Sequence, residues 1–334
     1  MFLSFIVPVY NARQYLEECL HSLLEQDIPD YEIICVNDGS TDGSDAVLNA
    51  FAAQYSQVNP IHQKNSGVAS ARNTGLAAAR GDYIWFVDAD DFIESNVLSR
   101  LQAIIAQTDC DQLVVGGFQF TQTLTPEQET QRREGGLPGN APGPGAVVWR
   151  SLIRRRFLNE HDVTFRHPEL THGEDGQFLF ELSLEAPVCA EIEDTVYFYR
   201  VRSGSAETGT SLENTQKKLR SHIRVAEIML EYYKSGSTDV TAANRLMSVL
   251  WYCLYGAAKL PLGNARQILN TLRASALFPF CRPENCTLTE SYMIDRGGFI
   301  GKIFDWVYMH LHTRWGFAMM WLSCHLLAFF RHNS

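Results

Sequence analysis

The fold is decided by the stretch Tyr83-Ile84-Trp85-Phe86-Val87-Asp88-Ala89-Asp90-Asp91. Its uncharged half, 83–87, is β-branched, aromatic or aliphatic throughout, which is typical of a parallel strand buried on both faces. The acids that follow lie at the carboxyl end of that strand, where open α/β sheets bind their ligands. Carboxylates crowded at one edge repel one another unless a cation or several hydrogen-bond donors separate them. The stretch therefore predicts a divalent metal that holds an anionic ligand, for which a diphosphate is the natural candidate.

Strands and helices alternate on the amino-terminal side of this stretch. The residue pattern predicts strands at 2–9, 31–36 and 60–62, and helices at 12–24, 44–55 and 67–79. Asn11 is expected to cap the first helix, because a short polar side chain at that point can accept a helical N–H. This alternation predicts an α/β fold with a mostly parallel central sheet and helices on both faces.

The pattern changes twice on the carboxyl-terminal side. Between 120 and 147 the periodicity is lost, and the Gly- and Pro-rich segment 134–145 predicts a loop. Order resumes at Trp149, and 188–200 contains strand-like pieces. From about Leu212 onward the apolar residues recur at helical spacing, so we place a domain boundary near Ser211. The predicted domains are 1–210 and a helical region at 211–334.

Composition narrows the class of protein. The chain has 334 residues, 46% of them hydrophobic and 20% charged, as in an ordinary globular protein. The formal net charge of -10 argues against nucleic acid as the main partner, which would need clustered Lys and Arg. The cysteines form no C-x-x-C pair, so neither a zinc site nor a disulfide framework is indicated. With no secretory leader pattern at the start of the chain, we expect a cytoplasmic protein with reduced thiols.

The segment 299–331 is apolar, contains tryptophan and is weakly basic. Its uncharged run from Trp315 to Phe330 is shorter than the ~20 residues that a helix needs to span a bilayer. Two interpretations stay open. The segment is either a helix in the membrane interface, which would place the protein peripherally on the inner face of the cytoplasmic membrane, or a packing helix of the carboxyl-terminal region.

Four short motifs stand in order within the first hundred residues, and two looser ones follow. The four are Val7-Pro8-Val9-Tyr10-Asn11, Val36-Asn37-Asp38-Gly39-Ser40-Thr41-Asp42-Gly43-Ser44, Asn65-Ser66-Gly67-Val68-Ala69-Ser70-Ala71-Arg72-Asn73 and Phe86-Val87-Asp88-Ala89-Asp90-Asp91. The looser ones are Trp149-Arg150-Ser151-Leu152-Ile153-Arg154-Arg155 and His172-Gly173-Glu174-Asp175-Gly176-Gln177-Phe178. Together they resemble the family 2 glycosyltransferases over roughly the first two hundred residues. The resemblance implies a GT-A fold, with a nucleotide-sugar half at about 1–115 and an acceptor half at about 147–210.

The resemblance also implies a role for individual residues on the donor side. Pro8 and Tyr10 would shape the wall of the base pocket, and Asp38 would accept a hydrogen bond from the imide of uracil. Arg72 would reach the donor phosphates as a permanently charged planar donor. Donor contacts are likewise implied for Gly67, Asp88 and Ala89.

For the reaction itself the resemblance implies sugar transfer with inversion, from a nucleotide sugar such as a UDP-sugar to a hydroxyl of a saccharide or lipid-linked saccharide. Asp90, with Asp88, would hold Mn²⁺ or Mg²⁺ at the leaving diphosphate. Asp175 would be the general base that accepts the proton of the acceptor hydroxyl. Glu174 and His172 would contact the acceptor.

Two features depart from common family patterns. Family members often carry a histidine after the Tyr-x-Arg strand, whereas 199–208 has none, so a third protein ligand for the metal has no candidate. Processive synthases carry Gln-x-x-Arg-Trp and several membrane helices, whereas this chain has Leu311-His312-Thr313-Arg314-Trp315. We therefore expect addition of a single sugar.

Other interpretations remain open from the residues alone. Glu174-Asp175 could be an exposed helix start, and Arg154-Arg155-Arg156 is more typical of a solvated face than of a phosphate site. A dinucleotide-dependent oxidoreductase is disfavoured because no G-x-G-x-x-G follows the first strand. The main alternative is a non-catalytic protein that binds carbohydrate or nucleotide sugar, or a scaffold of a polysaccharide assembly complex.

Overall fold

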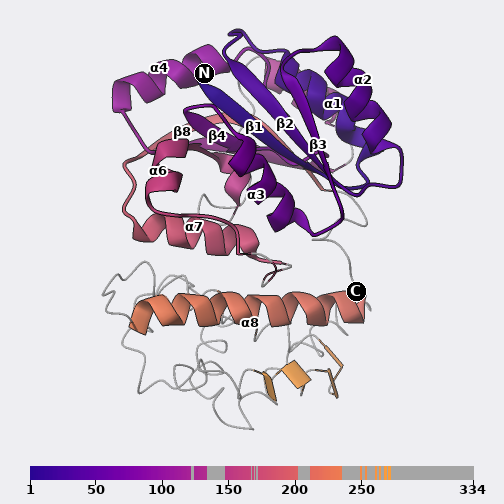
Figure 1. The fold of residues 1–334 in the computed structure, drawn as a ribbon, viewed down its shortest axis with the longest axis vertical. Coiled ribbons are helices and arrows are strands. Elements are labelled where there is room, and N and C mark those ends of the chain that lie inside the picture. Colours follow the sequence, from indigo (N-terminus) through magenta and orange to yellow (C-terminus); the bar gives the residue numbers. More distant parts are fainter. Residues whose placement is uncertain are drawn as a thin grey trace. The chain divides into compact units, whose positions relative to one another are not determined.

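The computed structural model describes most of the first two hundred residues and parts of the rest. The described residues are 1–121, 124–133, 147–166, 168, 170, 172–201 and 211–234, with scattered residues between 249 and 271. The chain divides into two compact units, Met1–Thr208 and Gly209–Ser334. In the second unit α8 is Leu212–Lys234, a helix as its apolar spacing predicted (Figure 1). The predicted loop 134–145 and the segment 299–331 lie outside the described residues.

The amino-terminal part of the first unit is a run of alternating strands and helices. These are β1 (Leu3–Val9), α1 (Arg13–Leu24), β2 (Tyr31–Asp38), α2 (Ser44–Gln54), β3 (Val58–Gln63), α3 (Val68–Ala78) and β4 (Tyr83–Phe86). The strands lie in the order β3-β2-β1-β4 and pair in parallel, so their carboxyl ends meet at one edge (Figure 1). The predicted βαβ alternation is confirmed.

The following elements extend the same sheet. They are β5 (Phe92–Ile93), α4 (Leu98–Thr108), β6 (Gln112–Thr121), α5 (Pro126–Arg133), the short 3-10 helix η1 (Val148–Arg150), β7 (Ser151–Arg154), α6 (Arg155–Glu160), α7 (Glu174–Leu184) and β8 (Cys189–Val201). The full order is β3-β2-β1-β4-β7-β6-β8-β5. Strand β7 is antiparallel to β4 and β6, and β5 is antiparallel to β8, so the sheet is mixed at this end.

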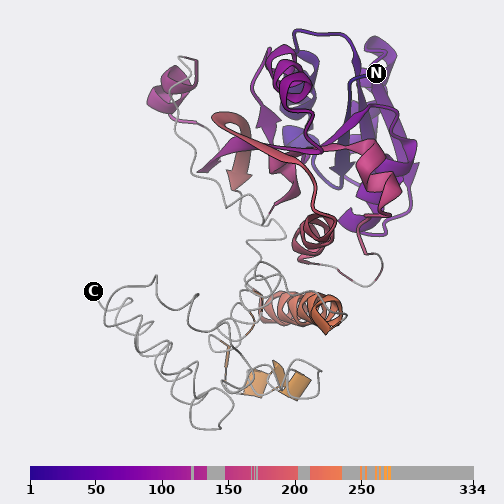
Figure 2. The same cartoon turned by 90° about the vertical axis from the view of Figure 1, so that its left-hand side faces the viewer.

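Helices cover both faces of the sheet (Figures 1 and 2). Side chains of α1, α2 and α4 share one apolar cluster with Tyr83, Trp85 and Val87. Side chains of α3, α6 and α7 share the other cluster with Ile84 and Phe86. The segment 83–87 therefore buries alternate residues on opposite faces, which explains why it carries no charge. No helix within the described residues is long and apolar enough to cross a membrane.

The sequence pattern missed α5. The Thr125 hydroxyl accepts the Gln128 N–H at 3.2 Å, and the Gln128 side-chain oxygen accepts the Thr125 N–H at 2.9 Å. This reciprocal pair is a capping box, with proline at the first helical position. The spacing Thr-Pro-Glu-Gln was the signal available in the sequence.

The expected cap at Asn11 is wrong. Ala12 holds the capping position of α1, and Asn11 has a positive φ of 50°. That conformation turns the Asn11 side chain toward the next loop, where its Oδ1 accepts the Thr41 N–H at 2.8 Å. The first N–H of the helix, on Arg13, donates instead to Asp42 Oδ2 at 2.9 Å. The loops that follow β1 and β2 are thus tied together.

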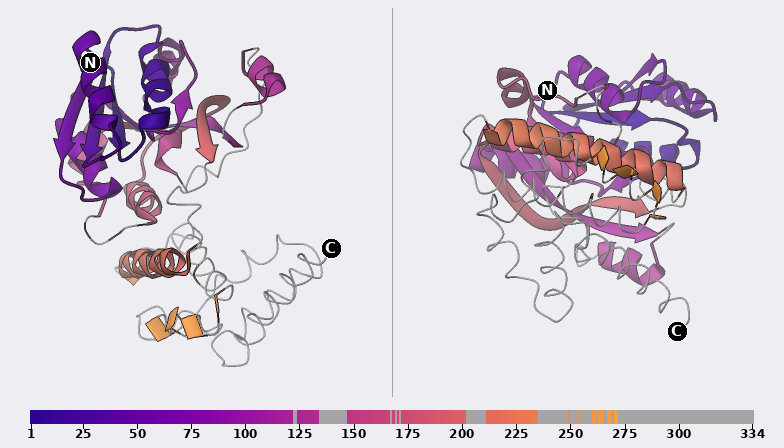
Figure 3. Two further views of the ribbon diagram at one scale, coloured as in Figure 1. Left: turned by 90° about the vertical axis from the view of Figure 1, so that its right-hand side faces the viewer. Right: turned by 90° about the horizontal axis from the view of Figure 1, so that it is seen from below.

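Strand β8 is long and curved, and it runs beside β6 with shifts of register near Gly116 (Figure 3). A Cβ at Gly116 would lie 2.4 Å from the backbone oxygens of Glu193 and Asp194, so only glycine allows this close approach. The far end of β8 pairs with β5, with Tyr197 opposite Ile93 and Phe198 opposite Phe92. Because β5 follows directly after Asp91, this pairing brings the end of β8 to the row of acids.

Candidate functional site

The carboxyl edge of the parallel strands carries the residues that the sequence assigned to donor binding. Pro8 is half-buried near the end of β1, and Tyr10, just beyond it, leaves 52% of its surface exposed. Ala89 is buried within the row of acids that follows β4. An exposed aromatic ring beside a half-buried proline can stack against a planar ligand. The predicted contacts of these residues with a nucleotide stay predictions.

Asp38, at the end of β2, is 3% exposed and holds the loop that leads into α3. Its Oδ1 accepts the Ser66 N–H and a Gln63 side-chain N–H, each at 2.8 Å, and its Oδ2 accepts the Gly67 N–H at 2.8 Å. Gly67 has a φ of +89°, which favours glycine. These bonds fix the loop between β3 and α3, and the predicted contact of Asp38 with uracil stays a prediction.

Arg72 of α3 draws the remaining predicted residues together. Its guanidinium is buried, and it donates through Nη2 to Asp88 Oδ1 at 2.9 Å. Through Nη1 it donates to Glu174 Oε1 at 3.2 Å and to Asp175 Oδ1. The guanidinium also lies over the ring of Phe165, 5.3 Å from its centre. One cation therefore joins the acids after β4 to the acids that begin α7.

The environment of Asp175 is unusual for a carboxylate. It stands in the first turn of α7, and its Oδ2 accepts the Val148 N–H at 3.2 Å. Burial raises the pKa of Asp175 to about 7; Arg72 opposes that rise, while Glu174 and Asp88 add to it. A carboxyl group with a pKa near neutrality can accept and release a proton in that range. His172 is half-buried in the turn before α7, and its predicted contact with an acceptor stays a prediction.

The three acids after β4 have different surroundings. Asp88 and Asp90 are half-buried, whereas Asp91 is 1% exposed. Asp91 accepts the Tyr197 hydroxyl on Oδ2 and the Arg200 N–H on Oδ1, each at 2.7 Å. Burial, with Asp90 and Asp88 nearby, raises the pKa of Asp91 well above its usual range. Asp91 therefore supports the turn from within, and Asp88 and Asp90 remain at its surface.

Sequence reasoning missed several residues that organise this site. Phe165 lies under Arg72, and Tyr197 and Arg200 hold the row of acids from β8. The Arg200 guanidinium lies over the ring of Tyr15 and over that of Phe120, and it donates to Glu18 at 2.6 Å. The available signal was the run 196–201, in which two tyrosines and Arg200 stand among apolar residues at the end of a strand whose first half is acidic.

Carboxylates suited to a metal are present at the site. Among the described residues, no group of three or more His, Cys, Asp or Glu is placed to hold a metal ion. The segment beyond Val201, where the family pattern has its histidine, lies outside those residues. Asp88 Oδ2 accepts no hydrogen bond from the described residues, and a hard divalent cation binds such carboxylate oxygens together with phosphate oxygens. Asp88 thus fits a metal that takes its other ligands from a diphosphate and water, and the predicted contact of Asp90 with that metal stays a prediction.

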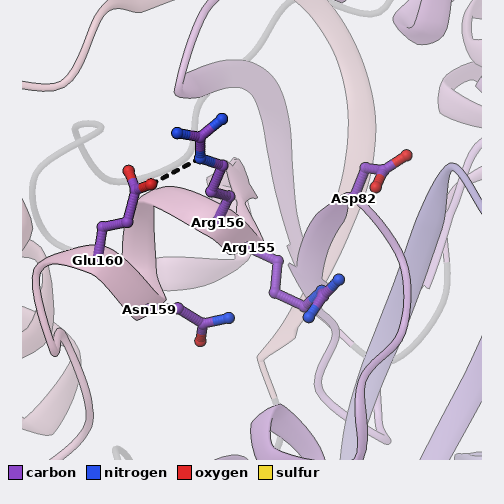
Figure 4. A pocket seen from close by; sticks show the side chains of 5 residues that line it. All are labelled: Asp82, Arg155, Arg156, Asn159 and Glu160. Carbon is purple, nitrogen blue, oxygen red and sulfur yellow. Dashed lines mark hydrogen bonds and ion pairs between the residues drawn. The ribbon is translucent and has the colours of Figure 1, made fainter.

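A separate surface pocket of about 430 Å³ lies at the opposite end of β4, beside Asp82 (Figure 4). Its other lining residues are Arg155, Arg156, Asn159 and Glu160. The Arg155 Nε donates to the backbone oxygen of Gly81, and the Arg156 Nε donates to Glu160, each at 2.6 Å. Both arginines are thus hydrogen-bonded to atoms of the protein itself, and Arg156 and Glu160 are exposed, as on a solvated face.

The chain is similar to several glycosyltransferases. Residues 4–170 match the family Glycosyl transferase family 2. The chain is 35% identical over 213 residues to glycosyltransferase EpsJ of Bacillus subtilis (strain 168), an alignment that covers 60% of this chain and 62% of that protein. It is 44% identical over 215 residues to a poly(ribitol-phosphate) beta-glucosyltransferase of Bacillus spizizenii, covering 60% of this chain and 32% of that one. The chain therefore spans less than two thirds of either relative.

The solved structures agree with the sequence comparison on the fold. The crystal structure of S. aureus TarS 1-349 in complex with UDP-GlcNAc superposes with a TM-score of 0.70 at 21% identity, over 100% of this chain and 93% of that one. This likeness shows the mixed sheet with flanking helices to be a GT-A fold. From its motifs, its fold and the match over residues 4–170, the chain belongs to glycosyl transferase family 2.

Proposed function

We propose that this protein moves one sugar from a UDP-sugar to a hydroxyl of a saccharide or lipid-linked saccharide, with inversion at the anomeric carbon. The observation that carries the proposal is the Arg72 guanidinium, which binds Asp88 on one nitrogen and Asp175 on the other. Asp88, on the side of the leaving diphosphate, and Asp175, which would activate the acceptor, are thus hydrogen-bonded to the same side chain. Relatives named for transfer of sugars to poly(ribitol-phosphate), and TarS with bound UDP-GlcNAc, support this class of donor and acceptor.

The donor would lie along the carboxyl edge of the sheet. Tyr10 would stack against the base with Pro8 beside it, and Asp38 would accept the uracil imide N–H. Asp88 and Asp90 would hold Mn²⁺ or Mg²⁺, which neutralises charge on the leaving diphosphate when bound. Arg72 adds a permanent positive charge beneath the same group.

Asp175 would act on the acceptor. As the acceptor oxygen bonds to the anomeric carbon, Asp175 takes the hydroxyl proton, and the bond from that carbon to the diphosphate oxygen breaks on the opposite side. Attack and departure on opposite sides invert the configuration. Glu174, held by the same Arg72 nitrogen, would orient the acceptor, and His172 stands just before it in the chain.

The proposal is tested with the purified 334-residue chain and a panel of nucleotide sugars, measuring slow donor hydrolysis and transfer with Mn²⁺ or with EDTA. We expect turnover of a UDP-sugar that EDTA abolishes and Mn²⁺ restores. No turnover with any donor, together with no binding of UDP in the presence of Mn²⁺, would contradict the proposal and favour a scaffold role.

The metal ligands are tested separately with Asp90→Asn. Loss of one carboxylate is expected to lower transfer on the order of 10²-fold or more, because the metal contributes several kcal/mol to stabilising the transition state. Asp45→Asn, the same change at an exposed residue of α2, serves as the control and should transfer at the wild-type rate. If Asp90→Asn and wild type depend on Mn²⁺ equally, Asp90 is not a ligand of the metal.

The pH dependence of kcat/KM reports on the base in the free enzyme. Because burial raises the pKa of Asp175 to about 7, the base is ionised above that pH and protonated below it. We expect kcat/KM to be constant at high pH and to fall about tenfold per unit of pH on the acid side. UDP binding measured across the same pH range controls for loss of the donor. A flat profile down to pH 5.5 would contradict the assignment of Asp175.

A further inference from the structure

The end of β8 holds the row of acids by four hydrogen bonds. The Tyr197 hydroxyl accepts the Asp88 N–H at 3.0 Å and donates to Asp91 Oδ2 at 2.7 Å. The Arg200 N–H donates to Asp91 Oδ1 at 2.7 Å, and its Nε donates to the backbone oxygen of Asp90 at 2.9 Å. The backbone that presents the two expected metal ligands is therefore shaped by a strand more than a hundred residues away in sequence.

The ring of Tyr197 reaches the other side of the site. It stacks on Trp149, with ring centres 4.3 Å apart and planes within 17°. The backbone oxygen of Trp149 accepts the indole N–H of Trp85 at 2.7 Å, which fixes η1 against β4. The residue before Trp149, Val148, donates its N–H to Asp175 Oδ2. One buried tyrosine thus connects by its hydroxyl to Asp88 and by its ring to the segment that holds Asp175.

Tyr197 is fully buried, and its hydroxyl already accepts one hydrogen bond and donates another. It has no donor left and no path to a substrate, so it can act only through the residues it holds. Outer residues that fix the ligands of a metal typically change metal affinity or activity when they are altered.

We propose that Tyr197 is a positioning residue of the transfer reaction, which keeps the metal-binding turn at Asp88 and the base Asp175 in register. This inference rests on the proposed function. The position of the metal-binding turn and that of Asp175 are therefore linked, because the first depends on the Tyr197 hydroxyl and the second on the Tyr197 ring.

The test is Tyr197→Phe, which keeps the stacked ring and removes only the hydroxyl. We expect the half-saturating concentration of Mn²⁺ to rise about 10-fold or more. At saturating Mn²⁺ most of kcat should return, because the ring still supports the Trp149 segment. Tyr83→Phe is the matched control, since the buried Tyr83 hydroxyl donates to the backbone of Cys110 at the other end of β4. It removes a comparable buried hydrogen bond and should leave the Mn²⁺ dependence within twofold of wild type.

A measurement without metal or substrate separates this inference from the proposed function. Hydrogen exchange should show the Asp88 amide protected in wild type and in Tyr83→Phe, and at least about tenfold faster in Tyr197→Phe. Unprotected Asp88 in wild type would overturn the inference even if Tyr197→Phe proved too unstable to assay. An active wild type whose Tyr197→Phe variant keeps the same Mn²⁺ dependence would overturn it as well. An inactive wild type that binds neither Mn²⁺ nor UDP would instead overturn the proposed function, and with it the role of Tyr197 as a positioning residue of that reaction.

Discussion

Asp175→Asn is expected to lower kcat by about 10³-fold while leaving the affinity for UDP close to that of wild type. Asparagine keeps the size of the side chain and an oxygen for the Val148 N–H, but it cannot accept the acceptor's proton. The reaction would then proceed with water as the base. The comparison requires kcat from single-turnover kinetics and a separate equilibrium measurement of UDP binding.

The control for Asp175→Asn is Glu185→Gln. Glu185 follows the last turn of the same helix and pairs with His161 on the surface, away from Arg72. The Glu185→Gln variant loses the same negative charge as Asp175→Asn and should transfer sugar at the wild-type rate. An Asp175→Asn variant with more than a tenth of wild-type kcat would mean that another group accepts the proton.

Arg72→Met is expected to destabilise the protein by about 3–5 kcal/mol, the usual result of removing one partner from a buried ion pair. Arg72 is 3% exposed and contacts Asp88, Glu174 and Asp175, so its loss leaves carboxylates without their common counter-charge. Urea denaturation gives the free energy of unfolding for wild type and variant.

The loss of stability in Arg72→Met should depend on pH. In the variant, the pKa of Asp175 should rise above its present value of about 7, further from the value of 3.8 that an ordinary aspartate has in an unfolded chain. A raised pKa in the folded state favours folding where the group is protonated, and this advantage is lost as the pH rises through that pKa. The deficit should therefore be smaller at pH 5.5 than at pH 8.

Arg156→Met is the control for Arg72→Met, because Arg156 and its partner Glu160 are both exposed. Its urea midpoint should match that of wild type. An Arg72→Met variant as stable as this control at pH 8 would mean that the stability of the protein does not depend on the ion pairs between Arg72 and these carboxylates.

Local patterns in the sequence were enough to predict the strands and helices of the amino-terminal part. The uncharged run 83–87 and the acids after it required no knowledge of distant residues, because burial on both faces and a polar strand end are visible in one short stretch. The roles of Asp88 and Asp175 came from a family resemblance. That Arg72 would join them depends on packing between α3 and α7, which lie a hundred residues apart.

The wrong prediction for Asn11 and the unassigned role of Asp91 have the same physical origin. Asn11 has the right chemistry for a cap, but contact with Thr41 in another loop decides its conformation. Asp91 looks like Asp88 and Asp90 in the sequence, and only the pairing of β5 with β8 turns it inward to Tyr197. Such partners are brought together by the sheet, and no spacing along the chain reveals them.

The tie between the first two loops also bears on how this fold handles negative charge. In dinucleotide-binding proteins the opening turn of the first helix offers its bare amides to a pyrophosphate. Here the amide of Arg13 is already occupied by the acidic side chain of Asp42, and that of Ala12 by the hydroxyl of Ser44. A diphosphate approaching this helix end would be repelled by the Asp42 carboxylate and would find the Arg13 amide already hydrogen-bonded. This helix end is therefore closed to a diphosphate, and in the proposed function the metal that Asp88 and Asp90 would hold takes over that role.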